Sequence, residues 1–280
     1  MKSIVVARLT VGEAARRRML LAALLLSAVF LVVYALGLHY GLRDFEVRAA
    51  RRPVSEQFMT FFIGQTVLAG LYVVSFLAGL IAIFMSVGTI SGEIDAGTLH
   101  TLVAKPLRRW EIVIGKWLGY LALLFCYTAI MAFGVLVIAY VRSGYWPPAT
   151  LPGLGSLLLG PVLLLSLSLA GSTILPTLAN GVVAFSLYGV ALIGGFVEQI
   201  GSLAENRTME NIGVAASLVI PSDSLWKLAA HLLQPPRGLV GIPSPFAPAS
   251  PPSTLLVGYA LLYIGFALAT AVAVFSKRDL

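Results

Sequence analysis

The stretch Phe58–Val87, FMTFFIGQTVLAGLYVVSFLAGLIAIFMSV, decides the fold class of this 280-residue chain. It contains no charged residue. A helix that crosses the hydrocarbon core of a bilayer needs about 20 mostly apolar residues. The stretch therefore predicts a membrane-spanning helix, long enough to tilt or to extend past the membrane surface.

Five further apolar runs are long enough to cross a membrane. The six predicted spans are Met19–Leu38, Phe58–Val87, Ile112–Val141, Leu154–Leu175, Val182–Ile200 and Leu255–Phe275. The composition agrees, because 59% of the residues are hydrophobic and only 11% are charged, whereas a soluble domain has about 25% charged residues. The sequence predicts an all-α polytopic membrane protein with about six transmembrane helices, forming a single transmembrane domain over residues 1–280.

The first run has an alternative interpretation as a cleaved signal peptide, because Arg16-Arg17-Arg18 precedes it. Its apolar core of about 20 residues exceeds the 7–15 residues of a cleaved signal. No clean small-x-small site precedes the polar stretch Arg43–Arg52. A retained first span is therefore favoured. Residues 1–18 mix apolar and basic side chains, which predicts an interfacial helix on the inner membrane surface.

The basic residues predict the orientation of the spans. With the N-terminus inside, eleven of the 19 lysines and arginines fall in inside segments, and the triplet Arg16–Arg18 precedes the first span. Cytoplasmic loops carry an excess of basic residues, and the first span usually dominates. We expect both termini on the cytoplasmic side of a prokaryotic inner membrane, with residues 39–57 as an outer loop. The net charge of +7 indicates anionic headgroups rather than nucleic acid, because the basic residues flank apolar runs.

Residues 201–254 make the largest predicted outer segment, and residues 255–280 hold the last span and a cytoplasmic tail. Within the outer segment, Ser222–Leu233 is predicted to be a short amphipathic helix that the Ser222 side chain can cap. Its apolar face would carry Leu225, Leu228, Ala229 and Leu232. Seven prolines between Pro235 and Pro252 exclude a regular helix there.

The sequence carries no motif for nucleotide binding or covalent catalysis. Trp117 follows Gly115-Lys116 where a phosphate-binding loop needs Ser or Thr. The three histidines are far apart, and the single Cys126 is predicted to be a small buried hydrophobe. We therefore expect no enzyme activity, no metal site and no cofactor in this chain.

Ionisable residues are nearly absent from the predicted spans. Glu198, near the outer end of the fifth span, is the main exception and is interpreted as a carboxylate that reaches the interface. Proton-driven and ion-driven transporters usually place ionisable groups at mid-membrane, so any work is expected to be driven from another subunit. Three glycine pairs have a spacing that lets helices approach closely, although such pairs also arise by chance in a chain with 27 glycines: Gly37/Gly41, Gly88/Gly92 and Gly115/Gly119.

The inner loop Ser91–Lys116, SGEIDAGTLHTLVAKPLRRWEIVIGK, is the most informative inner segment. Its apolar residues at helical spacing are Leu99, Leu102 and Val103. They predict a short amphipathic helix over about Asp95–Ala104, which Pro106 ends. Such a helix suits the groove of a partner protein. The alternative is a connector that lies flat on the bilayer.

This loop resembles the permease subunits of type-2 ABC transporters, in particular the subgroup of the nitrous-oxide-reductase maturation permease. The shared pattern is Glu-x-x-x-Gly-Thr-Leu, then Pro-x-x-Arg, then Gly-Lys. The matching positions are Glu93, Gly97, Thr98, Leu99, Pro106, Arg109, Gly115 and Lys116. A second patch, Pro221-Ser222-Asp223, is similar to the family's Asn-Pro-x-Asp segment, although Ile220 stands where Asn is common.

The resemblance implies two permease copies, in contact through spans one and five, and separate cytoplasmic ATPase chains that bind ATP and Mg. It implies a cytoplasmic coupling helix near residues 93–104 that transmits ATPase movement, in what is expected to be an exporter. The implied ATPase-coupling residues are Glu93, Asp95, Gly97, Thr98, Leu99, Leu102, Pro106 and Arg109. The alternative function is a non-transport membrane scaffold that docks extracytoplasmic partners, and copurification of an ATPase would separate the two.

Overall fold

The computed structural model describes residues 2–15, 18–49, 56–95, 97, 108–234, 246, 253 and 255–277. The helices are α1 Lys2–Ala15, α2 Arg18–Ala49, α3 Glu56–Ser86, α4 Ser91–Asp95, α6 Arg109–Ser143, α7 Thr150–Ser172, α8 Thr177–Leu203, α9 Arg207–Val219, α10 Ser222–Leu233 and α11 Leu255–Lys277. These described residues include no strand, and six helices are long and apolar enough to cross a membrane. The prediction of an all-α polytopic membrane protein is confirmed.

The main departure from the predicted spans is the length of α2. Residues 39–49, predicted as part of an outer loop, continue α2 as a regular helix. No proline interrupts this stretch, and five of its eleven residues are good helix formers: Leu42, Arg43, Glu46, Arg48 and Ala49. Leu42 is buried, and the Phe45 ring packs on the Phe62 ring of α3 with centroids 4.4 Å apart. Packing against α3 therefore extends the helix beyond the apolar run.

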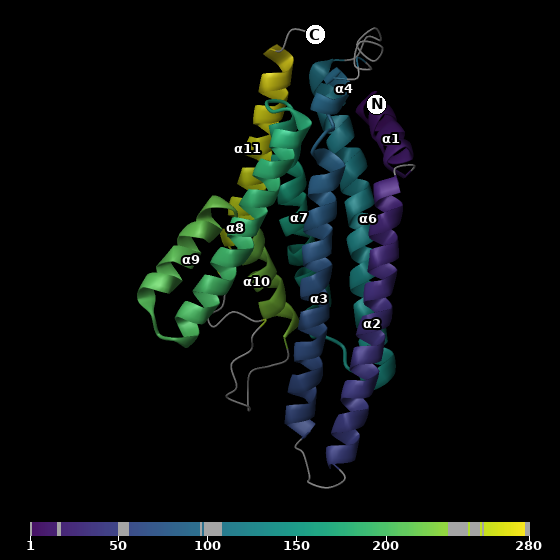
Figure 1. Cartoon of the computed structure of the whole chain (residues 1–280), viewed down its shortest axis with the longest axis vertical. Helices are drawn as coiled ribbons and strands as arrows, with labels where there is room; N and C mark the ends of the chain where they lie inside the picture. The colour runs from purple at the N-terminus through teal and green to yellow at the C-terminus, as the bar shows by residue number, and fades with distance from the viewer. Residues whose placement is uncertain are drawn as a thin grey trace.

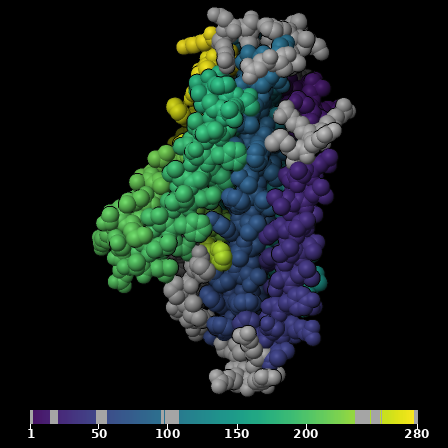
Figure 2. All heavy atoms as spheres, in the orientation of Figure 1, coloured from purple at the N-terminus to yellow at the C-terminus, as the bar shows by residue number. Residues whose placement is uncertain are grey.

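Helices α3 and α7 form the centre of the bundle. In the most apolar part of α7, 72% of the residues are buried, against 17% in α2. Helix α7 is apolar all round and packs against α3, α6, α10 and α11, as expected of a helix enclosed by others. Figure 2 shows that one strip of α3 stays uncovered between α2 and α8.

Residues 201–234 form two helices that pack against the bundle. Helix α9 packs along α8, and α10 packs on α7 (Figure 1). The predicted helix Ser222–Leu233 is confirmed as α10, with Leu225, Leu228 and Ala229 buried. The predicted Ser222 cap is wrong, because Ser222 is the first helical residue and makes no capping bond. Helix α9, which was not predicted, is capped by Asn206, whose side chain accepts from the Thr208 and Met209 amides.

Helix α1, α4 and the Lys277 end of α11 lie at the same end of the bundle (Figure 1). Helix α1 packs along α6 with Val6, Thr10 and Ala14 buried. The prediction of a buried Cys126 is wrong. Cys126 lies on an exposed face of α6. A membrane-spanning helix is apolar on the side that contacts lipid as well as on the side that is buried, so an apolar run does not show which of its residues are buried.

Candidate functional site

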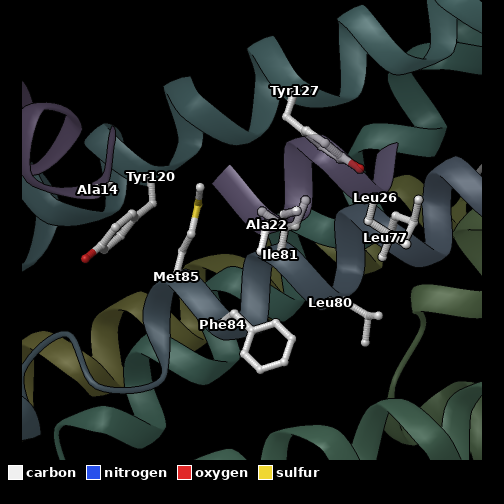
Figure 3. Close-up of a pocket in the computed structure, with 11 residues that line it drawn as sticks. Ala14, Ala22, Leu26, Leu77, Leu80, Ile81, Phe84, Met85, Tyr120 and Tyr127 are labelled. Carbon is white, nitrogen blue, oxygen red and sulfur yellow. The ribbon is translucent and has the colours of Figure 1, made fainter. Parts of the chain in front are cut away.

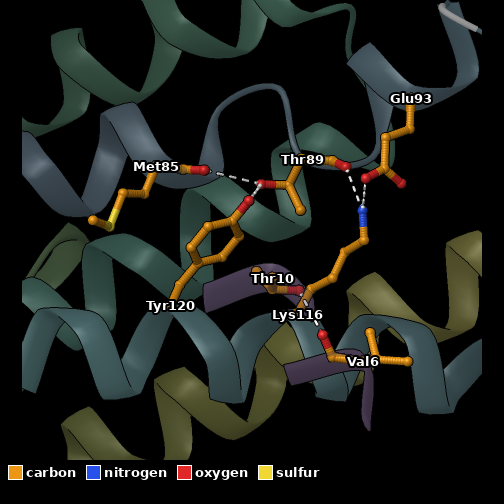
Figure 4. A network of polar contacts seen from close by, with 7 residues as sticks. All are labelled: Val6, Thr10, Met85, Thr89, Glu93, Lys116 and Tyr120. Carbon is orange, nitrogen blue, oxygen red and sulfur yellow. Dashed lines mark hydrogen bonds and ion pairs between the residues drawn. The ribbon is translucent and has the colours of Figure 1, made fainter. Parts of the chain in front are cut away.

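A buried ion pair joins α4 to the first part of α6. Lys116 Nζ pairs with the Glu93 carboxylate and donates a hydrogen bond to the Thr89 carbonyl oxygen at 2.9 Å (Figure 4). The Lys116 side chain is 5% exposed and the Glu93 side chain 18% exposed. Because little water screens this pair, its attraction is stronger than that of an exposed pair.

The turn between α3 and α4 is bonded to the same face of α6. Thr89 Oγ1 donates to the Met85 carbonyl oxygen at 3.1 Å and lies 3.3 Å from the Tyr120 hydroxyl. Tyr120 stands four residues after Lys116, so both side chains project from one face of α6. A charged anchor and a neutral anchor therefore hold the turn against α6.

The same turn is bonded to the start of α8. Asn180 Nδ2 donates to the Val87 carbonyl oxygen at 2.8 Å, and the hydroxyls of Ser91 and Thr177 lie 2.9 Å apart. A Cβ atom at Gly88 would lie 2.9 Å from Thr177 Cγ2, so the absence of a side chain there permits this approach. The turn thus connects α3 with both α6 and α8.

Gly115 and Gly119 let α1 lie directly against α6. A Cβ atom at Gly115 would lie 2.6 Å from Val6 Cβ, and one at Gly119 would lie 2.8 Å from the Ala7 carbonyl oxygen. Both distances are too short for any side chain to fit without moving α1. The predicted packing role of this glycine pair is confirmed.

The Gly37/Gly41 pair behaves differently. A Cβ atom at Gly37 would have no atom within 4 Å, and one at Gly41 would make only an ordinary contact with the Phe62 ring at 3.8 Å. The spacing alone is therefore not sufficient for close packing, because the partner helix must also lie opposite.

Arg109 connects the start of α6 to the end of α11. Its Nη1 atom donates to the carbonyl oxygens of Phe275 and Ser276 at 3.2 and 3.1 Å. The last carbonyls of a helix have no partner within the helix, and a cation there also matches the helix dipole. Arg109 therefore fastens the last span to the base of α6.

The structure describes only part of the predicted coupling segment. Thr98, Leu99, Leu102 and Pro106 lie outside the described residues, and of Asp95 only the backbone, at the end of α4, is described. Gly97 has φ 66°, and its amide donates to the Ile94 carbonyl oxygen. This left-handed conformation ends α4, so a regular right-handed helix that starts at Asp95 does not pass through Gly97.

Glu93 and Arg109 are the predicted coupling residues whose side chains are described, and they make separate contacts. Glu93 pairs with Lys116, whereas Arg109 binds the end of α11. The predicted coupling set does not contain Lys116. Lys116 belongs to the Gly-Lys pair that completes the sequence pattern, and this position could have identified it.

A second ionic cluster lies between α8 and α10. Lys227 Nζ binds Glu198 Oε2 at 2.8 Å and lies 3.0 Å from Asp223 Oδ2. Glu198 therefore pairs with a lysine of α10, whereas the interpretation from the sequence had it reaching the interface. The i,i+4 spacing of Asp223 and Lys227 could have predicted their pairing, but not the contact with α8.

Asp223 is the most enclosed member of this cluster, with 6% of its side chain exposed. Burial raises the pKa of the Asp223 carboxyl, while Lys227 lowers it and the nearby Glu198 carboxylate raises it. A Cβ atom at Gly195 of α8 would lie 2.0 Å from Asp223 Oδ2. Only glycine at position 195 therefore leaves room for this carboxylate against α8.

The comparison with known families supports the sequence pattern. The family model described as ABC-2 family transporter protein matches residues 4–280, which is nearly the whole chain. A search of curated proteins finds no match. The six apolar helices and the family match together show that the chain is a multi-pass membrane transport protein. The chain belongs to the ABC-2 family of transporter proteins, as the membrane permease component of an ABC transporter.

Proposed function

We propose that this permease is part of an exporter in which a separate ATPase drives transport, and that residues 93–109 form the segment that the ATPase moves. In this proposal ATP and Mg bind to the ATPase chains, and this chain contributes no catalytic group. Both termini and α4 face the cytoplasm of a prokaryotic cell. The common location of α1, α4 and the Lys277 end of α11 at one end of the bundle supports that topology (Figure 1).

The observation that carries the proposal is the Glu93–Lys116 ion pair. Glu93 stands at the entrance of the coupling segment, and Lys116 stands on the first span that follows it. Breaking a buried ion pair by removing one partner costs about 3–5 kcal/mol. A displacement of the coupling segment would therefore move α6 before it separated Glu93 from Lys116.

The movement would then spread through contacts of the same region. The α3–α4 turn would transmit it to α8 through Asn180 and Thr177. Helix α6 would transmit it to α1 at Gly115 and to α11 through Arg109. One segment would thereby reorient four helices together, which is what a switch between inward and outward states requires.

A second permease copy is part of the proposal. In their most apolar parts only 17% of α2 and 33% of α8 is buried, and both helices flank the uncovered strip of α3 (Figure 2). Exposed apolar faces on these two spans are available for contact with a second copy. Helix α11 is also exposed, with 22% of its most apolar part buried, so the choice of α2 and α8 follows the family resemblance. We also propose the nitrous-oxide-reductase maturation subgroup, on the sequence pattern alone.

The test compares two variants in the assembled complex. The double variant Leu99→Ala/Leu102→Ala should weaken ATPase binding by at least about tenfold, which corresponds to about 1.4 kcal/mol. Glu93→Gln should leave the ATPase bound but lower the transport-dependent ATPase rate in lipid vesicles. The control is Glu205→Gln, which changes an exposed carboxylate beyond the end of α8.

The outcomes separate the proposal from its alternative. Wild-type binding and stimulation by the double leucine variant would show that the segment is a passive connector. A complex that copurifies with extracytoplasmic proteins but with no ATPase would support the scaffold function instead. An active assembly with a single permease copy would contradict the dimer.

A further inference from the structure

An apolar cavity of about 280 Å³ lies between α2, α3 and α6 (Figure 3). Its wall on α3 runs from Leu77 to Met85, and its wall on α6 includes Tyr120 and Tyr127. Eight residues of helix correspond to about 12 Å along the axis. The cavity is therefore elongated in the direction of the spans.

Small residues on α1 and α2 create this space. Ala14, Ala22 and Ala23 face the cavity where the opposite walls carry leucine, isoleucine and methionine. Helix α2 is held to α6 farther along by the hydrogen bond between the hydroxyls of Ser27 and Tyr127, at 2.6 Å. The alanines thus leave a gap beside α2, and the Ser27–Tyr127 hydrogen bond anchors α2 to α6 at one end of that gap.

The lining excludes a polar occupant. Of the cavity residues that the structure describes, only the two tyrosines have polar side-chain atoms. The Tyr127 hydroxyl is bonded to Ser27, and the Tyr120 hydroxyl lies 3.3 Å from Thr89 Oγ1. A polar ligand entering the cavity would lose its hydrogen bonds to water without equivalent replacements.

The size and direction of the cavity match a lipid chain. An apolar cavity of about 150 Å³ stays dry and takes benzene, so a cavity of 280 Å³ holds an apolar group about twice that size. Acyl chains in a bilayer run roughly parallel to the spans, as this cavity does. A side chain from a second protein copy would enter across the spans and fill only part of the length.

The cavity opens on the outer surface of this chain, on the α2–α3 face that borders the proposed contact with a second copy, so an acyl chain there would lie at the edge of that contact. The rim of the cavity includes Leu26 of α2 and Phe84 of α3, which are 57% and 43% exposed. Leu24 and Leu25 of the same α2 stretch are exposed as well. We propose that the cavity binds one acyl chain of a phospholipid, from the leaflet at the α4 end of the bundle.

The test uses the full-length permease in vesicles of phosphatidylethanolamine and phosphatidylglycerol that contain a phospholipid with a photoreactive diazirine on one acyl chain. After illumination, mass spectrometry locates the labelled residues. We expect label on the α3 wall between Leu77 and Met85. Ala23→Phe, which fills the cavity, should lower that label by at least about tenfold, a difference of about 1.4 kcal/mol in occupancy.

The matched control is Ala28→Phe, which places the same ring on an exposed position of the same helix outside the cavity. It should leave the label on α3 unchanged. The proposal is overturned if Ala23→Phe keeps wild-type labelling of α3, or if only outward residues such as Leu24 and Phe125 are labelled. A disulfide between two permease copies through Leu80→Cys, in a Cys126→Ser background, would show instead that a second copy fills the cavity.

Discussion

Lys116 of α6 forms a buried ion pair with Glu93 of α4 and also bonds the Thr89 carbonyl oxygen. The two charged residues come from opposite ends of the inner loop. Their pairing closes that loop at its base, so the intervening segment is attached to the bundle at both ends by a strong contact. The ion pair is therefore a structural link, and in the proposed function it is the point where a force on the loop would enter the spans.

Lys116→Met should destabilise the permease more than the double variant Glu93→Gln/Lys116→Met does. The single change leaves the Glu93 carboxylate buried without its cation, at a cost of about 3–5 kcal/mol. The double change removes both charges and should recover a large part of that loss. Thermal unfolding of the purified protein in detergent measures the difference, and equal melting temperatures for the two variants would show that the pair contributes nothing.

Gly119→Leu should separate α1 from α6. Its side chain would collide with the Ala7 carbonyl oxygen and with Thr10, and overpacking of this kind costs about 1–3 kcal/mol. A cysteine at the buried position of Val6, in a Cys126→Ser background, reports the contact. It should be protected from a thiol reagent when residue 119 is glycine and should become labelled in Gly119→Leu. Gly12→Leu is the control, since a Cβ atom at Gly12 has no atom within 4 Å. Continued protection of the Val6→Cys thiol in Gly119→Leu would contradict the close packing.

Lys227→Met should destabilise the α8–α10 contact because it leaves Asp223 and Glu198 without their shared cation. We expect a loss of about 3 kcal/mol at neutral pH, at the lower end for a broken buried pair, since Glu198 is partly exposed. Adding Asp223→Asn should restore part of the stability. Unfolding in detergent measures both changes. If Lys227→Met/Asp223→Asn is less stable than Lys227→Met alone, the carboxylates of Asp223 and Glu198 do not repel each other.

The stability of the wild-type protein should also depend on pH through Asp223. Its pKa in the folded protein is raised above the ordinary value of 3.8, first of all by burial. Between that value and the raised pKa, the folded protein binds more protons than the unfolded one, so stability falls as the pH rises. Asp223→Asn should remove this part of the pH dependence in melting temperatures measured across acidic pH. An unchanged slope in the variant would assign the effect to another group.

Cysteines at Arg108 and Ser143 should be accessible from opposite sides of the membrane. Arg108 immediately precedes α6 and Ser143 is its last residue, and α6 is long and apolar enough to cross a bilayer once. In a Cys126→Ser background, a thiol reagent that does not cross membranes should label Ser143→Cys in intact cells and Arg108→Cys only after the cells are opened. The reverse pattern would invert the proposed orientation, and labelling of both from outside would exclude α6 as a span.

The six spans were predictable from the sequence because a run of about 20 apolar residues has few alternatives to a membrane helix. The inner-loop pattern around Glu93 was visible for the same local reason, since it depends on residue types at fixed spacing. Helix α10 also followed from the spacing of its leucines. Each of these properties is carried by residues close together in the chain.

The contacts between distant segments were decided by the tertiary structure alone. Glu93 meets Lys116, and Glu198 meets Lys227, only because α4 packs on α6 and α10 packs on α8. The exposed position of Cys126 and the helical continuation of α2 past Leu38 likewise depend on which faces the neighbouring helices cover. A membrane helix is apolar on the faces that contact lipid and on the faces that contact protein. Its sequence therefore determines that it spans the membrane but not which face it buries.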